Sequence, residues 1–546
     1  MTAHTAAKPA HAHGAAHGHA HREKPVKLDR KNGAPEIFIF FALLIGGLGY
    51  TVWSIWTDVQ AASPGVLTFA PFMLLLLALL IALGFEFVNG FHDTANAVAT
   101  VIYTNSLPAH FAVVWSGGWN FLGVLVSSGA VAFGIISLLP VELILHVGTG
   151  AGMAMVFALL IAAIIWNLGT WYLGLPASSS HTLIGSIIGV GIANQLIQGK
   201  SGVAGVDWSQ AANVGYALLL SPVVGFFAAG LLLLTMKVLV KNPALYAEPK
   251  PHHPPPWWIR GLLVLTCTGV SFAHGSNDGQ KGMGLIMLIL IGIVPTAYAL
   301  NRAIDSTDVA QFRALASVTQ ASLVKASDNA AVPADPRQAL TDYVRDRKLT
   351  PETVPALAAV AGEISALVGN HETLAQVPAA AVPNMRNDMY LASETIRLMG
   401  RQKEPTFDTE TGDNLAAFKR ALDNATKFIP LWVKVAVAIA LGLGTMVGWK
   451  RIVVTVGEKI GKTHLTYAQG GAAEVVAMGT IFAADMYGLP VSTTHVLSSG
   501  VAGTMAANKS GLQLSTVRNL AMAWVLTLPV AIILSGGLYI LLRQLM

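Results

Sequence analysis

Long apolar stretches, separated by short polar segments, run along most of this chain. Three shorter apolar segments, 91–104, 176–196 and 490–508, each follow polar or proline-containing sequence, and we expect them to be half-helices or re-entrant hairpins. The longer stretches have the length of about 20 residues that a membrane-spanning helix needs. They lie at 36–56, 67–88, 110–138, 150–173, 211–240, 257–273, 282–300, 430–457, 470–487 and 518–543. The pattern predicts an all-α, polytopic membrane protein with about 10–12 transmembrane helices.

The composition supports this class. Hydrophobic residues make up 53% of the chain and charged residues 12%, and the mean hydropathy is +0.58, which excludes an ordinary soluble protein. The net charge of +5 does not indicate a nucleic-acid partner, because the Lys and Arg residues flank the predicted spans. The single cysteine, Cys267, excludes an intramolecular disulfide.

Two regions differ from the membrane pattern. Residues 1–34 form a polar tail with six His residues, which we expect to be disordered; paired imidazoles could hold a metal ion, but such low-complexity sequence needs no function. Residues 301–428 contain 16 of the 29 acidic residues and are expected to form a hydrophilic, partly helical insertion, either a packed linker or a regulatory or partner-binding part. This insertion separates a membrane N-terminal part, 35–300, from a membrane C-terminal part, 429–546.

Basic residues predict the orientation. They cluster before residue 36, between 237 and 260, and between 450 and 462, so we expect these three segments on the cytoplasmic side. An even number of crossings must then join the first two clusters, whereas five of the long apolar stretches lie between them. At least one of the shorter segments is therefore expected to cross.

Two unusual sequences each occur twice. The first is Phe87-Val-Asn-Gly-Phe-His-Asp-Thr-Ala-Asn96, which returns as Phe272-Ala-His-Gly-Ser-Asn-Asp-Gly-Gln-Lys281. The second is Gly174-Leu-Pro-Ala-Ser-Ser-Ser-His181, which returns as Gly488-Leu-Pro-Val-Ser-Thr-Thr-His495. Polar residues inside membrane segments usually persist for function, and a duplicated pair of broken segments is typical of a transporter.

The second repeat has the chemistry of an anion site. In both copies a proline and three hydroxyl residues precede an apolar run of helical length, which predicts a helix N-terminus. Unpaired N–H groups and the helix dipole attract anions there, so two such ends facing each other could bind a tetrahedral oxyanion. Capping alone is the alternative, but one hydroxyl suffices for a cap. His181 and His495 either sense or donate protons, or brace the loop as neutral imidazoles.

The first repeat has the chemistry of a cation site. Asp93 and Asp278 each stand beside amides and a glycine, which we expect to let the helix unwind so that oxygen atoms converge on a cation. Hard oxygen ligands suit Na⁺, proton exchange or a divalent metal. The alternative for each Asp is a buried helix cap, which is costly for two carboxylates at membrane depth.

The segments GFHDTANA, HGSNDGQKG, PASSSHT and PVSTTH resemble the signature elements of the inorganic phosphate transporter (PiT) family, in the expected order. The chain is similar to the bacterial low-affinity phosphate symporters of that family. The resemblance implies two inverted repeats with re-entrant or broken helices, a phosphate site between them near the bilayer midplane, and alternating access. It also implies import of a neutral complex of a divalent metal and phosphate with a proton, through the bacterial inner membrane.

The resemblance implies a transporter that is not an enzyme and carries no resident cofactor or metal ion. Inorganic phosphate and the lipid bilayer are its implied partners, and a homo-oligomer is one of the open alternatives for its assembly. The phosphate-binding residues implied are Ser178, Ser179, Ser180, Ser492, Thr493 and Thr494. The residues implied for cation or proton coupling are Asp93, Asn96, Asn277, Asp278, Lys281 and Glu474, with His92, His181, His274 and His495 in support.

One departure from the family pattern concerns the coupling ion. Sodium-coupled members tend to have Asn-Asp-x-x-Asn in both copies, whereas this chain has His92 before Asp93 and Lys281 where Asn96 predicts an amide. A lysine ammonium within about 4 Å of a carboxylate could take the place of a bound cation. This difference favours proton coupling over sodium coupling.

Other functions remain as alternatives. A sodium-coupled phosphate symporter or a sulfate permease of the same superfamily would share the hydroxyl-rich helix ends. A membrane metalloenzyme is suggested by His92, Asp93, His274 and His495, but the chain lacks a short-spaced ligand set such as H-E-x-x-H. A passive channel is disfavoured because paired anion and cation sites suit coupled binding.

Overall fold

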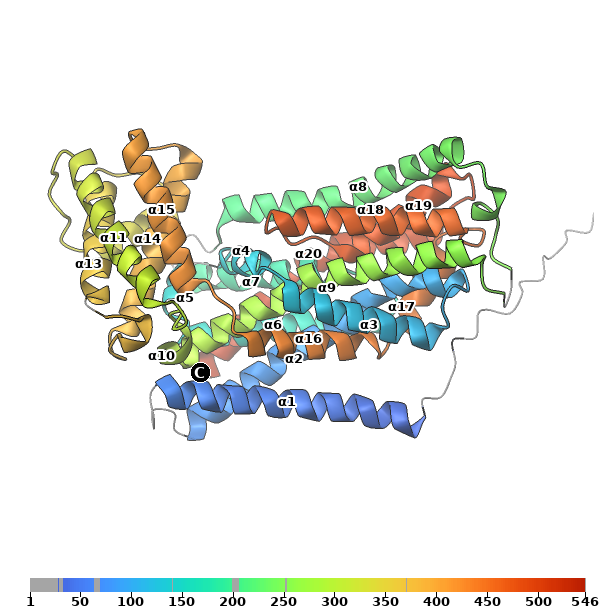
Figure 1. Ribbon diagram of the computed structural model, residues 1–546, viewed down its shortest axis with the longest axis horizontal. Helices are drawn as coiled ribbons and strands as arrows, with labels where there is room; N and C mark the ends of the chain where they lie inside the picture. The colour runs from blue at the N-terminus through green and yellow to red at the C-terminus, as the bar shows by residue number, and fades with distance from the viewer. Residues whose placement is uncertain are drawn as a thin grey trace, which may run out of the picture.

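The computed structural model describes residues 28, 33–62, 69–139, 141–198, 206–250, 253–369 and 371–545, with the backbone alone at 70, 94–96 and 142 (Figure 1). These residues form helices and, apart from one isolated bridge between Gly461 and Leu512, no β-structure. The all-α fold class is thereby confirmed. The predicted disorder of the His-rich tail falls almost wholly outside the described residues.

Long helices lie side by side in the membrane part (Figure 1). In the N-terminal part these are α1 (Ala34–Ala62), α2 (Phe69–Tyr103), α3 (Ala109–Val126), α6 (Gly150–Tyr172), α7 (Ser179–Gln198), α8 (Trp208–Leu239) and α9 (Trp257–Ile293), with the short α4 (Ala130–Ile136), α5 (Val141–Leu145) and α10 (Pro295–Tyr298). The C-terminal part contains α16 (Leu431–Thr445), α17 (Lys450–Val454), α18 (Tyr467–Met486), α19 (Thr493–Ala507) and α20 (Leu514–Leu545).

Seven of the described helices, α1, α2, α3, α6, α7, α8 and α20, are long and apolar enough to span a membrane. An eighth span results if α15 (Thr409–Thr426) and α16, which are bent by 67°, count as one. This number is below the 10–12 expected, partly because α16 and α19 have only 15 residues each. A full span needs about 20 residues.

The predicted break at the first repeat is wrong. Residues 67–88 and 91–104 belong to one helix, α2, and 257–273 and most of 282–300 belong to another, α9. The glycines of the repeat serve close helix packing instead of unwinding. A Cβ atom on Gly90 would lie 2.3 Å from the carbonyl oxygen of Leu441, and one on Gly275 would lie 2.1 Å from that of Asn120. Small residues allow helix backbones in membranes to approach in this way.

The second repeat does break the helices, as expected. α6 and α7 form one hairpin and α18 and α19 another, each with the repeated motif at its tip. Gly174 and Gly488 end the first helix of each hairpin with φ values of 68° and 64°, a left-handed conformation that favours glycine.

Residues of two basic clusters, and Glu36 directly after the first cluster, lie at one end of the molecule. Arg260, Lys450, Arg451 and Glu36 line a common cavity there, and the carbonyl of Lys250 accepts a hydrogen bond from Asn105, just beyond the end of α2. Six long helices, α1, α2, α3, α6, α7 and α8, separate the first two clusters, and α7 is the additional one that the charge pattern required. The predicted common side is therefore consistent with the fold, and its cytoplasmic location stays a prediction.

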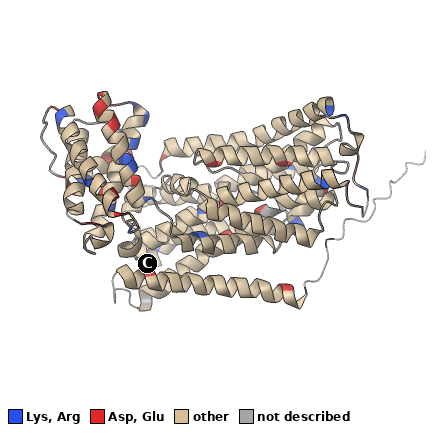
Figure 2. Cartoon of the chain, viewed as in Figure 1, with Lys and Arg blue, Asp and Glu red and all other residues tan. Residues whose placement is uncertain are grey.

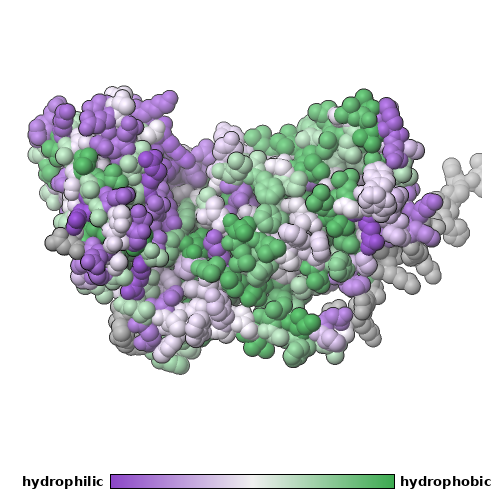
Figure 3. Space-filling view, viewed as in Figure 1, coloured by the Kyte–Doolittle hydropathy of each residue, from purple (hydrophilic) through white to green (hydrophobic). Residues whose placement is uncertain are grey.

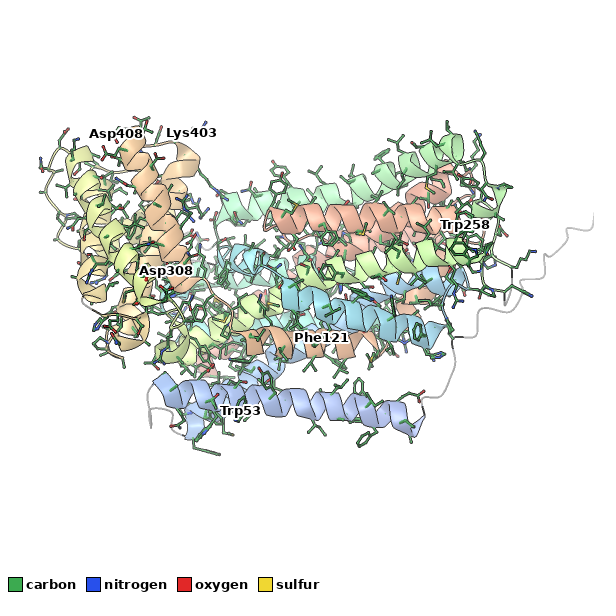
Figure 4. All side chains as sticks on the ribbon, viewed as in Figure 1. Trp53, Phe121, Trp258, Asp308, Lys403 and Asp408 are labelled. Carbon is green, nitrogen blue, oxygen red and sulfur yellow. The ribbon has the colours of Figure 1, made fainter. Side chains whose placement is uncertain are left out.

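The insertion lies at the opposite end (Figures 1 and 2). It consists of α11 (Ser306–Ala326), α12 (Pro336–Asp346), α13 (Thr353–Val368), α14 (Val382–Gln402) and α15, and Figure 4 labels Asp308, Lys403 and Asp408 on it. Its own core includes Phe312 stacked on Phe418, with ring centroids 6.0 Å apart. Arg347 forms an ion pair with Asp207, which caps α8, and thereby ties the insertion to the membrane part.

The outer surface agrees with a membrane location. Figure 3 shows an apolar middle between hydrophilic ends, and Figure 2 shows the charged residues concentrated on the insertion and at the far end. Trp53 on α1 is 61% exposed and Phe38 is 74% exposed, as expected for side chains that contact lipid.

Candidate functional site

All four repeated motifs meet inside the membrane part. Asp93 on α2 accepts a hydrogen bond of 2.7 Å from Ser179 Oγ, at the N-terminus of α7. Its other oxygen, Oδ1, accepts a hydrogen bond from Thr494, at the N-terminus of α19. The two hairpin tips also contact each other, since Ser180 Oγ donates to the carbonyl of Val491 over 2.8 Å. The two helix N-termini therefore converge on one carboxylate.

The hydroxyls of each triplet have different partners. Ser178 and Ser492 act as caps, because their Oγ atoms accept hydrogen bonds from the backbone N–H groups of His181 (3.2 Å) and His495 (3.1 Å). Among the described residues, Thr493 Oγ1 has no hydrogen-bond partner although it is buried. One hydroxyl per copy thus suffices for capping, and the other two are available for different work.

The second copy of the first motif places a cation beside its carboxylate. Lys281 Nζ lies 2.7 Å from Asp278 Oδ2, and both side chains are fully buried. His274 Nε2 lies 3.4 Å from the same oxygen, while its Nδ1 lies 2.9 Å from Asn120 Oδ1. Lys281 therefore occupies the position next to Asp278 where a bound cation would otherwise compensate the charge.

Asn277 has a different environment from the one its predicted role suggests. Its Nδ2 donates to the carbonyl of Leu489 over 3.1 Å, and its Oδ1 accepts from the N–H of Val491 over 3.4 Å. Both amide groups thereby hold the extended backbone at the tip of the α18–α19 hairpin. The side chain of Asn96 lies outside the described residues.

Histidine side chains contact the residues of the site. His92 Nδ1 lies 3.2 Å from Asp93 Oδ1 and its Nε2 lies 3.2 Å from Thr170 Oγ1. The rings of His181 and His495 have centroids 4.5 Å apart, and His495 stacks on Trp524 at 4.2 Å. Whether His181 and His495 also carry protons stays a prediction.

Glu474 is buried but not joined to this cluster. It accepts a hydrogen bond from Thr266 on α9. Thr266 and Asp278 lie on the same helix, and at a rise of about 1.5 Å per residue they are about 18 Å apart along its axis. A role of Glu474 in coupling would therefore act at a distance from Asp278.

The structure adds two carboxylates that the motifs did not indicate. Glu86 on α2 is fully buried and packs against Gly282, where a Cβ atom would lie 2.3 Å from Glu86 Cγ. Asp485 accepts hydrogen bonds of 2.7 Å from Ser276 and from Gln280. The sequence did contain a signal for a role of Glu86 in the site. It is a lone Glu in an apolar run, seven residues before Asp93 and hence on the same helix face.

A small set of ligand atoms could hold a cation. Asp93, His274 and Asp278 each offer one such atom, and these atoms lie within 4.8 Å of one another in a fully buried environment. Two carboxylates and an imidazole suit a divalent metal ion. The sequence predicts no resident metal ion. A metal ion carried together with a substrate is a different case, and these three ligand atoms are compatible with it.

Cavities lie on both sides of the buried site. One of about 1230 Å³, at the end with the basic clusters, is lined by Trp171 near the tip of the α6–α7 hairpin. Another of about 730 Å³ lies between the membrane part and the insertion, and is lined by Gly488 and Leu489 at the tip of the other hairpin. Asp93 is only 2% exposed and lines neither cavity. Each hairpin tip thus lies near a different cavity.

Comparisons of the sequence with known proteins agree on one family. The profile described as "Phosphate transporter family" matches residues 89–535. The low-affinity inorganic phosphate transporter PitA of Escherichia coli K12 is 43% identical, over 86% of this chain and 96% of PitA; PitB of the same organism is 41% identical, over 87% and 97%. A solved structure, the sodium-dependent phosphate transporter, is 18% identical with a TM-score of 0.48, over 87% of this chain and 100% of that chain.

Proposed function

The chain belongs to the phosphate transporter family, and on that premise we propose that it imports inorganic phosphate by symport with a proton. It is a multi-pass protein of the bacterial inner membrane and a transporter, not an enzyme. The observation that carries the proposal is the convergence of two helix N-termini, through Ser179 and Thr494, on the carboxylate of Asp93. Helix N-termini with hydroxyl donors are typical oxyanion sites.

This convergence suggests how a proton couples to phosphate. The Asp93 carboxylate engages the same hydroxyl donors that a phosphate oxygen would need. An ionised Asp93 therefore competes with phosphate for these donors and also repels it. Protonation of Asp93 removes the negative charge and weakens its hold on both hydroxyls, so proton binding and phosphate binding favour each other.

Lys281 supports a proton rather than sodium as the coupling ion. Its ammonium group lies 2.7 Å from Asp278, so a sodium ion at this carboxylate would meet a like charge in a medium that screens poorly. A divalent metal would instead be carried with phosphate as substrate, and because it meets the same like charge at Asp278, the phosphate oxygens would supply most of its ligands. The phosphate would meet that metal at the hydroxyl end of the site.

Alternating access would involve the two hairpins. Their tips touch through Ser180 and Val491, and each tip lies near a different cavity. Movement of one tip would open the site to one side while the other tip stays closed, as inverted repeats permit. The inverted repeat of the two halves is itself part of this proposal.

Uptake of labelled phosphate into proteoliposomes tests the function and the coupling ion together. Imposed separately, an inward proton gradient should drive accumulation, and an inward Na⁺ gradient at equal pH should not. Arsenate should compete with phosphate, whereas sulfate should not. Accumulation with the Na⁺ gradient alone would contradict proton coupling, and an absence of any phosphate accumulation would contradict the transport function.

A further inference from the structure

The cavity between the insertion and the membrane part has an unusual lining. Four cationic side chains from the insertion and its connection to α16 face it, against one carboxylate, Glu394. These cations are Arg386, Arg397, Arg401 and Lys427. The lining therefore carries an excess of positive charge above the tip of the α18–α19 hairpin.

Two of these cations have carboxylate partners. Arg397 lies 2.6 Å from Glu394, and Lys427 lies 2.9 Å from Asp423. The other two have neutral acceptors: Arg386 donates to the carbonyl of Ile144 over 3.2 Å, and Arg401 donates to Gln210 over 3.3 Å. Neither Arg386 nor Arg401 forms an ion pair with a carboxylate of the described chain.

Burial makes the charge of Arg386 costly. Its side chain is only 8% exposed, and this burial lowers its pKa to about 10. The face of Tyr390, 5.4 Å away, provides a weak compensation. A buried guanidinium is normally paired with an anion, so an anion from solution would complete this environment.

The position of the cavity identifies the anion. Leu489 forms part of its lining and accepts the hydrogen bond from Asn277, whose neighbour is Asp278, and Val491 two residues later contacts Ser180. The tip of the α18–α19 hairpin thus lines the cavity and also contacts the buried site. The cavity lies at the end opposite the basic clusters, which is the predicted outer side.

We propose that this cavity is an anion vestibule, in which Arg386 and Arg401, about 22 Å apart along α14, attract the phosphate oxyanion at two separate points before it passes the α18–α19 hairpin tip. The inference rests on the proposed phosphate import and assigns part of it to the insertion. A positively lined cleft raises the local concentration of an anionic substrate. A neutral metal–phosphate complex would gain little from this field, so the vestibule acts on free phosphate and a metal joins it deeper in the site.

The test measures phosphate uptake by intact bacteria that express the full chain and lack other phosphate transport, so that the outer side faces the medium. Arg386→Gln/Arg401→Gln should raise KM on the order of tenfold at low ionic strength, with kcat unchanged. The difference should shrink as salt is raised, because screening shortens the reach of the charges. Lys325→Gln/Arg420→Gln removes two exposed cations elsewhere on the insertion and should leave KM unchanged.

Two further variants separate a folding defect from the proposal. Arg401 is exposed, so Arg401→Glu should fold normally and raise KM more than Arg401→Gln does. Arg386→Lys keeps the charge at the buried position, so its KM should lie close to that of wild type. Equal KM values for wild type and Arg401→Glu, with wild-type accumulation intact, would overturn the vestibule. No accumulation by the wild type would instead overturn the transport function on which it rests.

Discussion

Asp93 and Thr494 stand 401 positions apart in the sequence, yet Thr494 donates a hydrogen bond to the Asp93 carboxylate. This contact joins a continuous helix of the N-terminal part to the N-terminus of a short helix of the C-terminal part. Ser179 contributes the second donor from the other hairpin. The single carboxylate thus links elements from both halves, and any movement that separates the hairpins must change its hydrogen bonds.

Replacement of Asp93 by Asn tests the competition between carboxylate and phosphate. The variant cannot take up a proton at this position, so we expect accumulation driven by a pH gradient to fall by on the order of 100-fold. Exchange of phosphate across the membrane at equal pH should persist, because a neutral amide does not repel the anion. Asp308→Asn, at an exposed position of the insertion, is the matched control. Full pH-driven accumulation by Asp93→Asn would contradict the coupling role.

The serine triplet permits a test that separates capping from substrate binding. Ser178 caps α7, so Ser178→Ala should cost about 1 kcal/mol of stability and lower the Tm with little change in KM. Ser179 donates to Asp93, and its removal eliminates a donor to a charged group, worth about 1.5–3 kcal/mol. We therefore expect Ser179→Ala to raise KM by about 10- to 100-fold. The reverse assignment of the two effects would show that Ser179 is only structural.

The sequence predicted the chemistry of the site correctly in more respects than it predicted the local backbone structure. The hydroxyl triplets and the two carboxylates carry their chemistry in residue type, and the structure brings Asp93, Ser179 and Thr494 together. The prediction that the repeat glycines unwind the helices is wrong, because a glycine that unwinds a helix and one that permits close packing look alike in a single sequence. Only the partner backbone, such as the Asn120 carbonyl beside Gly275, distinguishes them.

Two other features could not be obtained from the sequence for a related reason. Glu86 lies against Gly282 on a different helix. The hydrophobic periodicity of a membrane segment does not show which other helix packs against it. The vestibule likewise arises where α14 of the insertion meets the hairpin tip near Leu489. Both depend on contacts between segments that are distant in the chain.

The packing role of the repeat glycines leads to a stability prediction. A methyl group on Gly275 would lie 2.1 Å from the Asn120 carbonyl oxygen, so Gly275→Ala should force α9 away from α3. We expect a loss of about 1–3 kcal/mol, typical of overpacking, seen as a lower Tm in detergent. Gly261→Ala on the same helix meets no atom within 4 Å and should leave the Tm unchanged or raise it. A fully stable Gly275→Ala would indicate that the backbone there can shift without cost.

We expect the choice of coupling ion to depend on the residue beside Asp278. Lys281→Asn removes the ammonium group 2.7 Å from Asp278. It also gives position 281 the amide that Asn96 has at the equivalent position of the first copy. The buried carboxylate then lacks a counter-ion, which typically costs about 3–5 kcal/mol, unless a cation from solution takes the place of Lys281. We therefore expect Na⁺ to raise the Tm of Lys281→Asn but not of wild type, and a Na⁺ gradient to stimulate its phosphate uptake. Lys281→Arg keeps the charge and should show neither effect; a Na⁺ response of wild type equal to that of Lys281→Asn would remove Lys281 from ion selection.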